Sequence, residues 1–290
     1  MVIQLLRPKN NLIKKILPVI LCAGEGTRLK SITEKVPKPL IPFKALNNKP
    51  ILEDLIFKLI KLDINKIAVV KGHLGNKIEE FTRILQKKND FLRNRIVTID
   101  SGEDYKKGPL YSFLSVSKLK KTFGKDFIYM VLPGDTIFEF DLLKTITDYI
   151  INNYKAIKQN PVIFYRNINI NVLKERFKLK NVSVANLGSQ KFNIFLKKIE
   201  TTNLMDIHES KDLNHFIPII VMGQKHVGEI LKLEKKSNVK TLREVLSLLI
   251  VEKKQISAVY LENKYNFYDI DYEDDINNVE KVLKGEKKGQ

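Results

Sequence analysis

The stretch that decides the expected fold reads Leu17-Pro18-Val19-Ile20-Leu21-Cys22-Ala23-Gly24-Glu25-Gly26-Thr27-Arg28-Leu29. Its apolar part, residues 17–23, predicts a strand buried in a sheet. The two glycines then allow a sharp backbone turn that brings N–H groups close to a polyphosphate, and Arg28 adds a planar cation suited to phosphate oxygens. We therefore expect a nucleotide-binding loop with contacts from Cys22, Ala23, Gly24, Glu25, Gly26, Thr27 and Arg28.

Two other phosphate-binding patterns are excluded for this loop. A Walker loop requires Gly-Lys-Ser/Thr after its spacer, which is absent here. A dinucleotide-binding fingerprint requires a third small residue where this chain has Leu29. The loop is therefore glycine-rich but belongs to neither of these two types.

Beyond this stretch, short apolar runs alternate with helical patterns along the chain. This alternation predicts one α/β, Rossmann-like domain with a mixed, mostly parallel sheet flanked by helices. Further strands are expected at 67–70, 96–99, 127–132, 161–165, 193–199, 216–221 and 257–261. Helices are expected at 51–62, 78–85, 110–119, 142–151, 242–251 and 274–283, and Thr241 with Glu244 has the spacing of a capping box.

The sequence suggests a single domain at 16–285, preceded by a basic extension at 1–15. Residues 167–214 have a looser pattern with many polar positions, which we interpret as an elaboration over the sheet rather than a second domain. No linker rich in Pro, Gly or Ser divides the chain, and no repeat of the solenoid kind is present.

Composition narrows the classes of partner and compartment. The chain has 51 basic and 33 acidic residues, but the lysines are spread out, so we expect solvated helix faces rather than a nucleic-acid partner. No apolar run approaches the roughly 20 residues that cross a bilayer. The single cysteine, Cys22, and the lack of a secretory signal indicate the cytoplasm. The oligomeric state is open, a homo-oligomer included.

Three further segments carry charged residues that suit phosphate chemistry. Prolines on both sides of Lys38 restrict the backbone and hold its ammonium in one direction, where it can neutralise a phosphoryl group. Asp135 follows the strand 127–132, at the carboxyl end where open α/β sheets bind ligands, and can hold Mg²⁺; a turn aspartate is the alternative. Near the end of the chain, alternation places Asp269 and Asp271 on the same face of a short strand, while Asp274 and Asp275 fit the first turn of a helix.

Together these motifs resemble the sugar-phosphate nucleotidylyltransferase family. The resemblance rests on Gly24-Glu25-Gly26-Thr27-Arg28-Leu29 followed by Pro37-Lys38-Pro39-Leu40, and residues 269–275 are similar to the closing motif of cytidylyltransferase-like members. It implies a GT-A-like fold, with Mg²⁺ as the cofactor. The site residues that it implies are Arg28, Lys38 and Asp135 for catalysis, Asp135 with Asp271 or Asp269 for the metal, Gly72 and Gly108 for the nucleotide, and Lys197, Lys198 and Glu200 for the acceptor, on the elaboration at 167–214.

The implied reaction couples a nucleoside triphosphate (NTP) to a phosphorylated small molecule, a sugar 1-phosphate by preference, and releases pyrophosphate. A phosphate monoester has a second pKa of about 6 and needs no general base to attack. Three alternatives remain: a CTP-dependent cytidylyltransferase for phosphocholine or inositol phosphate, a nucleotide-sugar glycosyltransferase, and a non-catalytic regulator that binds nucleotide or RNA.

Overall fold

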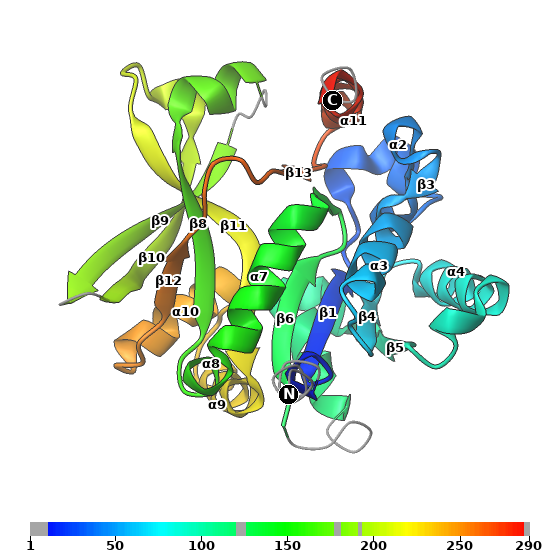
Figure 1. Ribbon diagram of the computed structural model, residues 1–290, viewed down its shortest axis with the longest axis horizontal. Helices are drawn as coiled ribbons and strands as arrows, with labels where there is room; N and C mark the ends of the chain where they lie inside the picture. Colours follow the sequence, from blue (N-terminus) through cyan, green and yellow to red (C-terminus); the bar gives the residue numbers. More distant parts are fainter. Residues whose placement is uncertain (1–10, 120–125, 177–180, 191–192, 287–290) are drawn as a thin grey trace, which may run out of the picture.

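The computed structural model describes residues 11–119, 126–176, 181–190 and 193–286. Most of the predicted basic extension therefore lies outside the described residues. A nine-stranded sheet forms the centre, in the order β5-β4-β1-β6-β11-β8-β12-β10-β9 (Figure 1). Its strands are β1 (Ile16–Cys22), β4 (Ile67–Lys71), β5 (Ile96–Asp100), β6 (Ile128–Pro133), β8 (Val162–Asn169), β9 (Asn181–Gln190), β10 (Asn193–Asn203), β11 (Asp212–Gly223) and β12 (Ser257–Tyr260).

The sheet is mixed, as expected, and its two halves differ. Strands β5, β4, β1 and β6 pair in parallel, which agrees with the expected strand–helix units. Among the described residues of the other half, β12 with β8 is the only parallel pair. Strand β11 pairs antiparallel with β6, β8 and β9, and β10 pairs antiparallel with β12 and β9. The expectation of mostly parallel strands thus holds for the first half of the chain alone.

Helices cover both faces of the sheet. One face packs against α3 (Ile51–Lys61), α4 (Gly75–Lys88) and α7 (Phe140–Asn152), and Figure 1 shows α3 and α7 over β1 and β6. The other face packs against α5 (Pro109–Leu114), α9 (Gln224–Glu234) and α10 (Leu242–Val251). Strand β1 contributes to the cores on both faces of the sheet, with Ile16 and Ile20 on one side and Leu17 and Val19 on the other. This burial on both faces explains why the strand is apolar throughout.

Several short elements complete the chain. They are α2 (Lys30–Thr33), α8 (Tyr154–Ile157), β2 (Pro42–Phe43) and β3 (Lys49–Pro50). With them are the π-helical segment η7 (Val172–Arg176) and the short 3₁₀ segments η1 (Thr27–Leu29), η2 (Lys38–Leu40), η3 (Lys44–Leu46), η4 (Asp90–Leu92), η5 (Gly102–Lys107), η6 (Ser115–Leu119) and η8 (Leu204–Asp206). The predicted helix 110–119 is therefore α5 followed by the tighter turn η6. None of the described helices is both long and apolar enough to span a membrane.

A second, small sheet joins the middle of the chain to its end. Strand β7 (Thr136–Phe138) pairs antiparallel with β13 (Phe267–Asp269), and Asp269 lies opposite Thr136. Helix α11 (Glu273–Glu286) follows and packs through Val279 against Tyr268 and Ile270. This sheet brings the segment after β6 next to the segment before α11.

The predicted elaboration at 167–214 consists of the β9–β10 hairpin with the ends of β8 and β11. It has a small core of its own, formed by Ile168, Ile170, Leu173, Val182, Leu204 and Leu213. Strand β9 nevertheless pairs with β11 where Val184 faces His215, so these strands extend the central sheet. The alternation in β9 was not predicted, and neither was α9, in which Gly228 and many polar residues weaken the helical pattern.

Candidate active site

The predicted phosphate loop follows β1, at the carboxyl edge of the sheet. Strand β1 pairs with β4 on one side and β6 on the other, so the loop lies at a switch point of the sheet, where open α/β sheets bind ligands. Gly26 has φ of +63°, and a Cβ there would lie 2.9 Å from Thr33 Cγ2. The Thr33 hydroxyl donates to the carbonyls of Gly26 (2.9 Å) and Leu29 (3.0 Å). Thr33 and the glycine thus hold the turn, whereas a Cβ on Gly24 would meet no atom within 4 Å.

Two other glycines pack closely against the loop from its neighbouring strands. A Cβ on Gly72 would lie 2.8 Å from the Ala23 Cβ, and the next residue, His73, donates its N–H to the Ala23 carbonyl at 3.1 Å. Gly134 donates to the Leu21 carbonyl, and its Cβ would lie 2.6 Å from Cys22 Sγ. The Cys22 thiol is buried there, and burial, with the charge of Asp135, raises its pKa well above the ordinary value.

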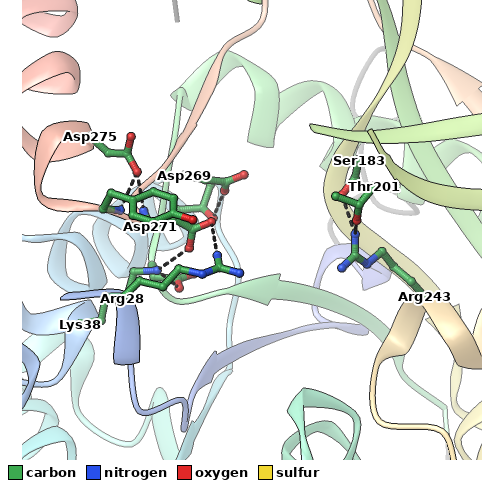
Figure 2. A network of polar contacts seen from close by, with 11 residues as sticks. Arg28, Lys38, Ser183, Thr201, Arg243, Asp269, Asp271 and Asp275 are labelled. Atoms are coloured by element: carbon green, nitrogen blue, oxygen red, sulfur yellow. Dashed lines mark hydrogen bonds and ion pairs between the residues drawn. The ribbon is translucent and has the colours of Figure 1, made fainter. Parts of the chain in front are cut away.

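Lys38 is the centre of the polar cluster. The turn η2 begins at this residue directly after Pro37, and its side chain is buried. The Lys38 ammonium lies 3.1 Å from Asp271 Oδ1 (Figure 2). It lies 2.7 Å from Asp135 Oδ2. Burial alone would lower the pKa of Lys38, but the charges and hydrogen bonds of the two carboxylates outweigh it and raise the pKa. Lys38 therefore stays charged between the carboxylates.

Arg28 joins the same cluster from the phosphate loop. Its Nη1 lies 3.0 Å from Asp271 Oδ2 (Figure 2). Its guanidinium lies over the Tyr272 ring, 5.6 Å from the ring centroid. Asp275 accepts hydrogen bonds from the backbone N–H groups of Asp271 (2.8 Å) and Tyr272 (2.7 Å). The acidic residue in the first turn of α11 thus fixes the turn that presents Asp271.

Asp269 lies beside this cluster but has a different partner. The Thr136 hydroxyl donates to its Oδ1 at 2.6 Å. Desolvation by the surrounding protein raises the pKa of Asp269 to about 6, although the residue is still in contact with solvent. The negative charges of Asp135 and Asp271 also raise this pKa. A bound cation would offset this effect of the neighbouring charges on Asp269.

The carboxylates fit the coordination chemistry of Mg²⁺. Within the described ranges, no group of three or more His, Cys, Asp or Glu side chains is arranged to hold a metal by itself. Mg²⁺ often takes only one or two carboxylates and completes its shell with water and substrate phosphates. Asp135 and Asp271, which share the Lys38 ammonium, match that requirement, and Asp269 lies next to them.

The structure gives Gly108 a packing role. Its φ is +133°, and a Cβ would lie 2.5 Å from the Lys240 carbonyl oxygen. Pro109 then begins α5, and Leu110 donates its N–H to the same carbonyl at 3.0 Å. A contact from Gly108 to a nucleotide stays a prediction, as does one from Gly72.

The three residues predicted for the acceptor lie on β10. The Lys198 ammonium pairs with Glu200 at 2.5 Å, and Asn186 of β9 donates to the same carboxylate at 2.8 Å. Lys197 lies over Gly188, where a Cβ would be 2.7 Å from its Cε. Lys198 and Glu200 thus have partners within the hairpin, and their contact with an acceptor stays a prediction.

Sequence reasoning missed a buried cation that supports the site. Arg166 is 1% exposed, and its Nε lies 3.3 Å from His215 Nδ1 while its Nη1 donates to the Tyr265 carbonyl at 2.9 Å. Burial and the charge of Arg166 lower the pKa of His215 to about 3, so that histidine is neutral. Arg166 ties β8 and β11 to the segment that leads into Asp269. The sequence feature that could have revealed Arg166 is its position, as a charged residue, within an otherwise apolar strand.

The sequence matches the nucleotidyl transferase family over residues 17–163, and the chain belongs to this family. It is 33% identical over 180 residues to the bifunctional protein GlmU of Methanococcus aeolicus, covering 60% of this chain and 39% of that protein. It is 36% identical over 126 residues to the D-glycero-alpha-D-manno-heptose 1-phosphate guanylyltransferase of Campylobacter jejuni, covering 43% of this chain and 50% of that one. The chain thus spans half or less of the length of these two relatives.

A solved structure extends the likeness to nearly the whole chain. The inositol-1-phosphate CTP transferase from T. maritima has a TM-score of 0.65 at 18% identity, covering 95% of this chain and 98% of that one. At this identity the likeness shows a shared fold. The family resemblance and the Rossmann-like fold expected from the motifs are therefore confirmed.

Proposed function

We propose that this chain is a nucleotidylyltransferase that joins an NTP to a phosphorylated small molecule and releases pyrophosphate. The observation that carries the proposal is the Lys38 ammonium held between Asp135 and Asp271, with Arg28 of the glycine loop bonded to the same Asp271. A sugar 1-phosphate is the favoured acceptor, since one relative is named for a heptose 1-phosphate. The free, buried thiol of Cys22 fits a reducing compartment, and we infer a cytoplasmic location.

In the proposed reaction, an oxygen of the acceptor's phosphate forms a bond to the α-phosphorus of the NTP. The bond from that phosphorus to the oxygen bridging to the β-phosphate breaks, and pyrophosphate leaves. The acceptor is mostly a dianion at neutral pH, so no side chain has to remove a proton from it. The protein's contribution is then to position the two substrates and to neutralise charge.

The roles follow from where the charges lie. The loop N–H groups and Arg28 would bind the outer phosphates of the NTP. Lys38 would neutralise negative charge on the transferred or the leaving phosphate. A bound Mg²⁺, held by Asp135 with Asp271 or Asp269, would supply further positive charge to the phosphates. Because Asp271 shares the Lys38 ammonium with Asp135, we favour Asp271 over Asp269 as the second ligand.

The experiment that tests this function measures pyrophosphate release with Mg²⁺. Each common NTP is paired with sugar 1-phosphates, phosphocholine and inositol phosphate. The last two acceptors test the cytidylyltransferase alternative, which the closing motif at 269–275 favours. We expect release with one pairing, its loss in Asp135→Ala, and its retention in Asp148→Ala, a control at an exposed position on α7. No release from folded wild-type protein with any pairing would contradict the proposal.

A further inference from the structure

Arg243 forms a second polar cluster, apart from Lys38 and its carboxylates. It lies in the first turn of α10, between Thr241 and Glu244, the two residues of the capping box. Its Nη1 donates to Ser183 Oγ at 2.8 Å and to Thr201 Oγ1 at 3.0 Å. Ser183 and Thr201 are direct partners in the β9–β10 ladder. Two hydroxyl groups on neighbouring strands thus orient one guanidinium.

The rest of this guanidinium has no partner in the part of the chain that the structure describes. Neither Nε nor Nη2 donates to a described residue, and no described carboxylate lies within ion-pairing distance of Arg243. The nearest acid along the helix, Glu244, accepts instead from the backbone N–H groups of Lys240 and Thr241. The half-buried Arg243 therefore keeps one edge, Nε with Nη2, free for an anion.

Residues close to Arg243 and Ser183 in the sequence contact segments that border the candidate active site. The Lys240 carbonyl binds the N–H of Leu110, so the start of α10 is fixed to the start of α5. Ser183 precedes Val184, which pairs with His215, and His215 lines the same small pocket as Asp269. Figure 2 shows the Arg243 side chain extending from α10 toward the side where Lys38, Asp269 and Asp271 gather.

We propose that the free edge of Arg243 binds the phosphate of the acceptor substrate. This inference rests on the proposed function and assigns a residue to its second substrate. A guanidinium edge matches two oxygens of a phosphate, and arginine binds such groups in a bidentate manner. Two oxygens held in this way leave the third terminal oxygen to form the bond to the α-phosphorus, as pyrophosphate leaves.

Arg243 and two of the predicted acceptor residues, Lys198 and Glu200, lie on opposite faces of the β9–β10 hairpin. Alternation along a strand turns Glu200 to the opposite face of the ladder from Thr201, and Lys198 lies on the face of Glu200, with which it pairs. The Lys198 ammonium is therefore directed to a carboxylate on the other side of the hairpin. Lys198 thus has a carboxylate partner, whereas Arg243 has none among the described residues.

The test uses the NTP and acceptor that support pyrophosphate release in the wild-type protein. We expect Arg243→Ala to raise the KM for the acceptor about 10- to 100-fold, as for loss of hydrogen bonds to a charged group. The KM for the NTP should stay at its wild-type value, and loss of the two hydrogen bonds to Ser183 and Thr201 should lower the melting temperature only slightly. Arg243→Lys keeps the charge but not the bidentate edge, and should raise the acceptor KM by a smaller factor.

Two further variants sharpen the result. Ser183→Ala with Thr201→Val removes the orienting hydroxyls and should raise the acceptor KM less than Arg243→Ala does. Arg93→Ala removes an exposed arginine that pairs with Asp90, and it serves as the control with unchanged kinetics.

The outcomes distinguish this inference from the proposed function. An unchanged acceptor KM in Arg243→Ala, with wild-type release intact, overturns the assignment of Arg243 and leaves the function standing. A rise confined to the KM for the NTP also overturns it. Should Arg243→Ala fail to fold, the acceptor KM of Arg243→Lys and of Ser183→Ala with Thr201→Val is compared with the wild-type value instead. If the wild-type protein releases no pyrophosphate with any pairing, the function and this inference fall together.

Discussion

Replacing Lys38 by methionine separates the catalytic role that we propose for this side chain from its structural role. The change keeps a long apolar stem but removes the ammonium that contacts Asp135 and Asp271 at 2.7 and 3.1 Å. Two effects limit the loss of stability. Burial already opposes the charge on Lys38, and the two carboxylate side chains are 36% and 45% exposed, so water screens them once the ammonium is gone. We expect the free energy of unfolding to fall by about 1–2 kcal/mol.

The effect on turnover should be much larger. Loss of one preorganised group that stabilises charge in a transition state costs about 100- to 1,000-fold in rate. The assay is kcat/KM for pyrophosphate release with the wild-type substrate pair, alongside thermal unfolding of the same preparation. Lys58→Met is the matched control, because the partly buried Lys58 pairs with Asp54 at 2.6 Å and donates to the Phe138 carbonyl. It should lose similar stability and keep its activity. Near-wild-type activity in Lys38→Met, or an equal loss in Lys58→Met, would refute the reasoning.

Three other predictions follow from the site and its supports. Asp271→Asn should lower kcat and raise the Mg²⁺ concentration for half-maximal activity more than Asp269→Asn does, and the reverse order in a Mg²⁺ titration would exchange their roles. Gly134→Ala places a Cβ 2.6 Å from Cys22 Sγ and should destabilise the protein by about 1–3 kcal/mol in denaturant unfolding, whereas Gly24→Ala, with no atom within 4 Å, should leave stability unchanged. The unfolded chain protonates His215 near pH 6.5 but the folded protein only near pH 3, so stability falls as the pH drops through this window. At pH 5 this group should cost roughly 2 kcal/mol relative to neutral pH, and a His215→Gln variant with the same pH slope as the wild type would contradict that.

Local patterns predicted the elements of the parallel half and much of the cluster. The loop after β1 was predicted because Gly24 and Gly26 follow an apolar run, and Gly26 indeed has a positive φ. The capping box of α10 was predicted from Thr241 and Glu244, and both of its hydrogen bonds are present. In each case the interacting residues lie within a few positions of one another, so spacing alone determines whether they can meet.

The other half of the sheet escaped prediction for a physical reason. Strand β9 has few apolar residues, because part of it packs on a small core and part is exposed. Helix α9 likewise presents only a narrow apolar stripe, with Val227 and Ile230 buried. Weak periodicity of this kind does not distinguish a half-covered strand or helix from a loop.

By itself, the sequence determined the residue types for phosphate chemistry and the strand ends at which they stand. Only the tertiary structure decided which of them meet. Lys38 lies 97 positions from Asp135 and 233 from Asp271, and their contact depends on the pairing of β7 with β13, which no local spacing specifies. Arg243 meets Ser183 and Thr201 in the same way, through the packing of α10 on the β9–β10 hairpin. Contacts between distant segments form because apolar faces pack together, and that packing sets the final positions of the charges.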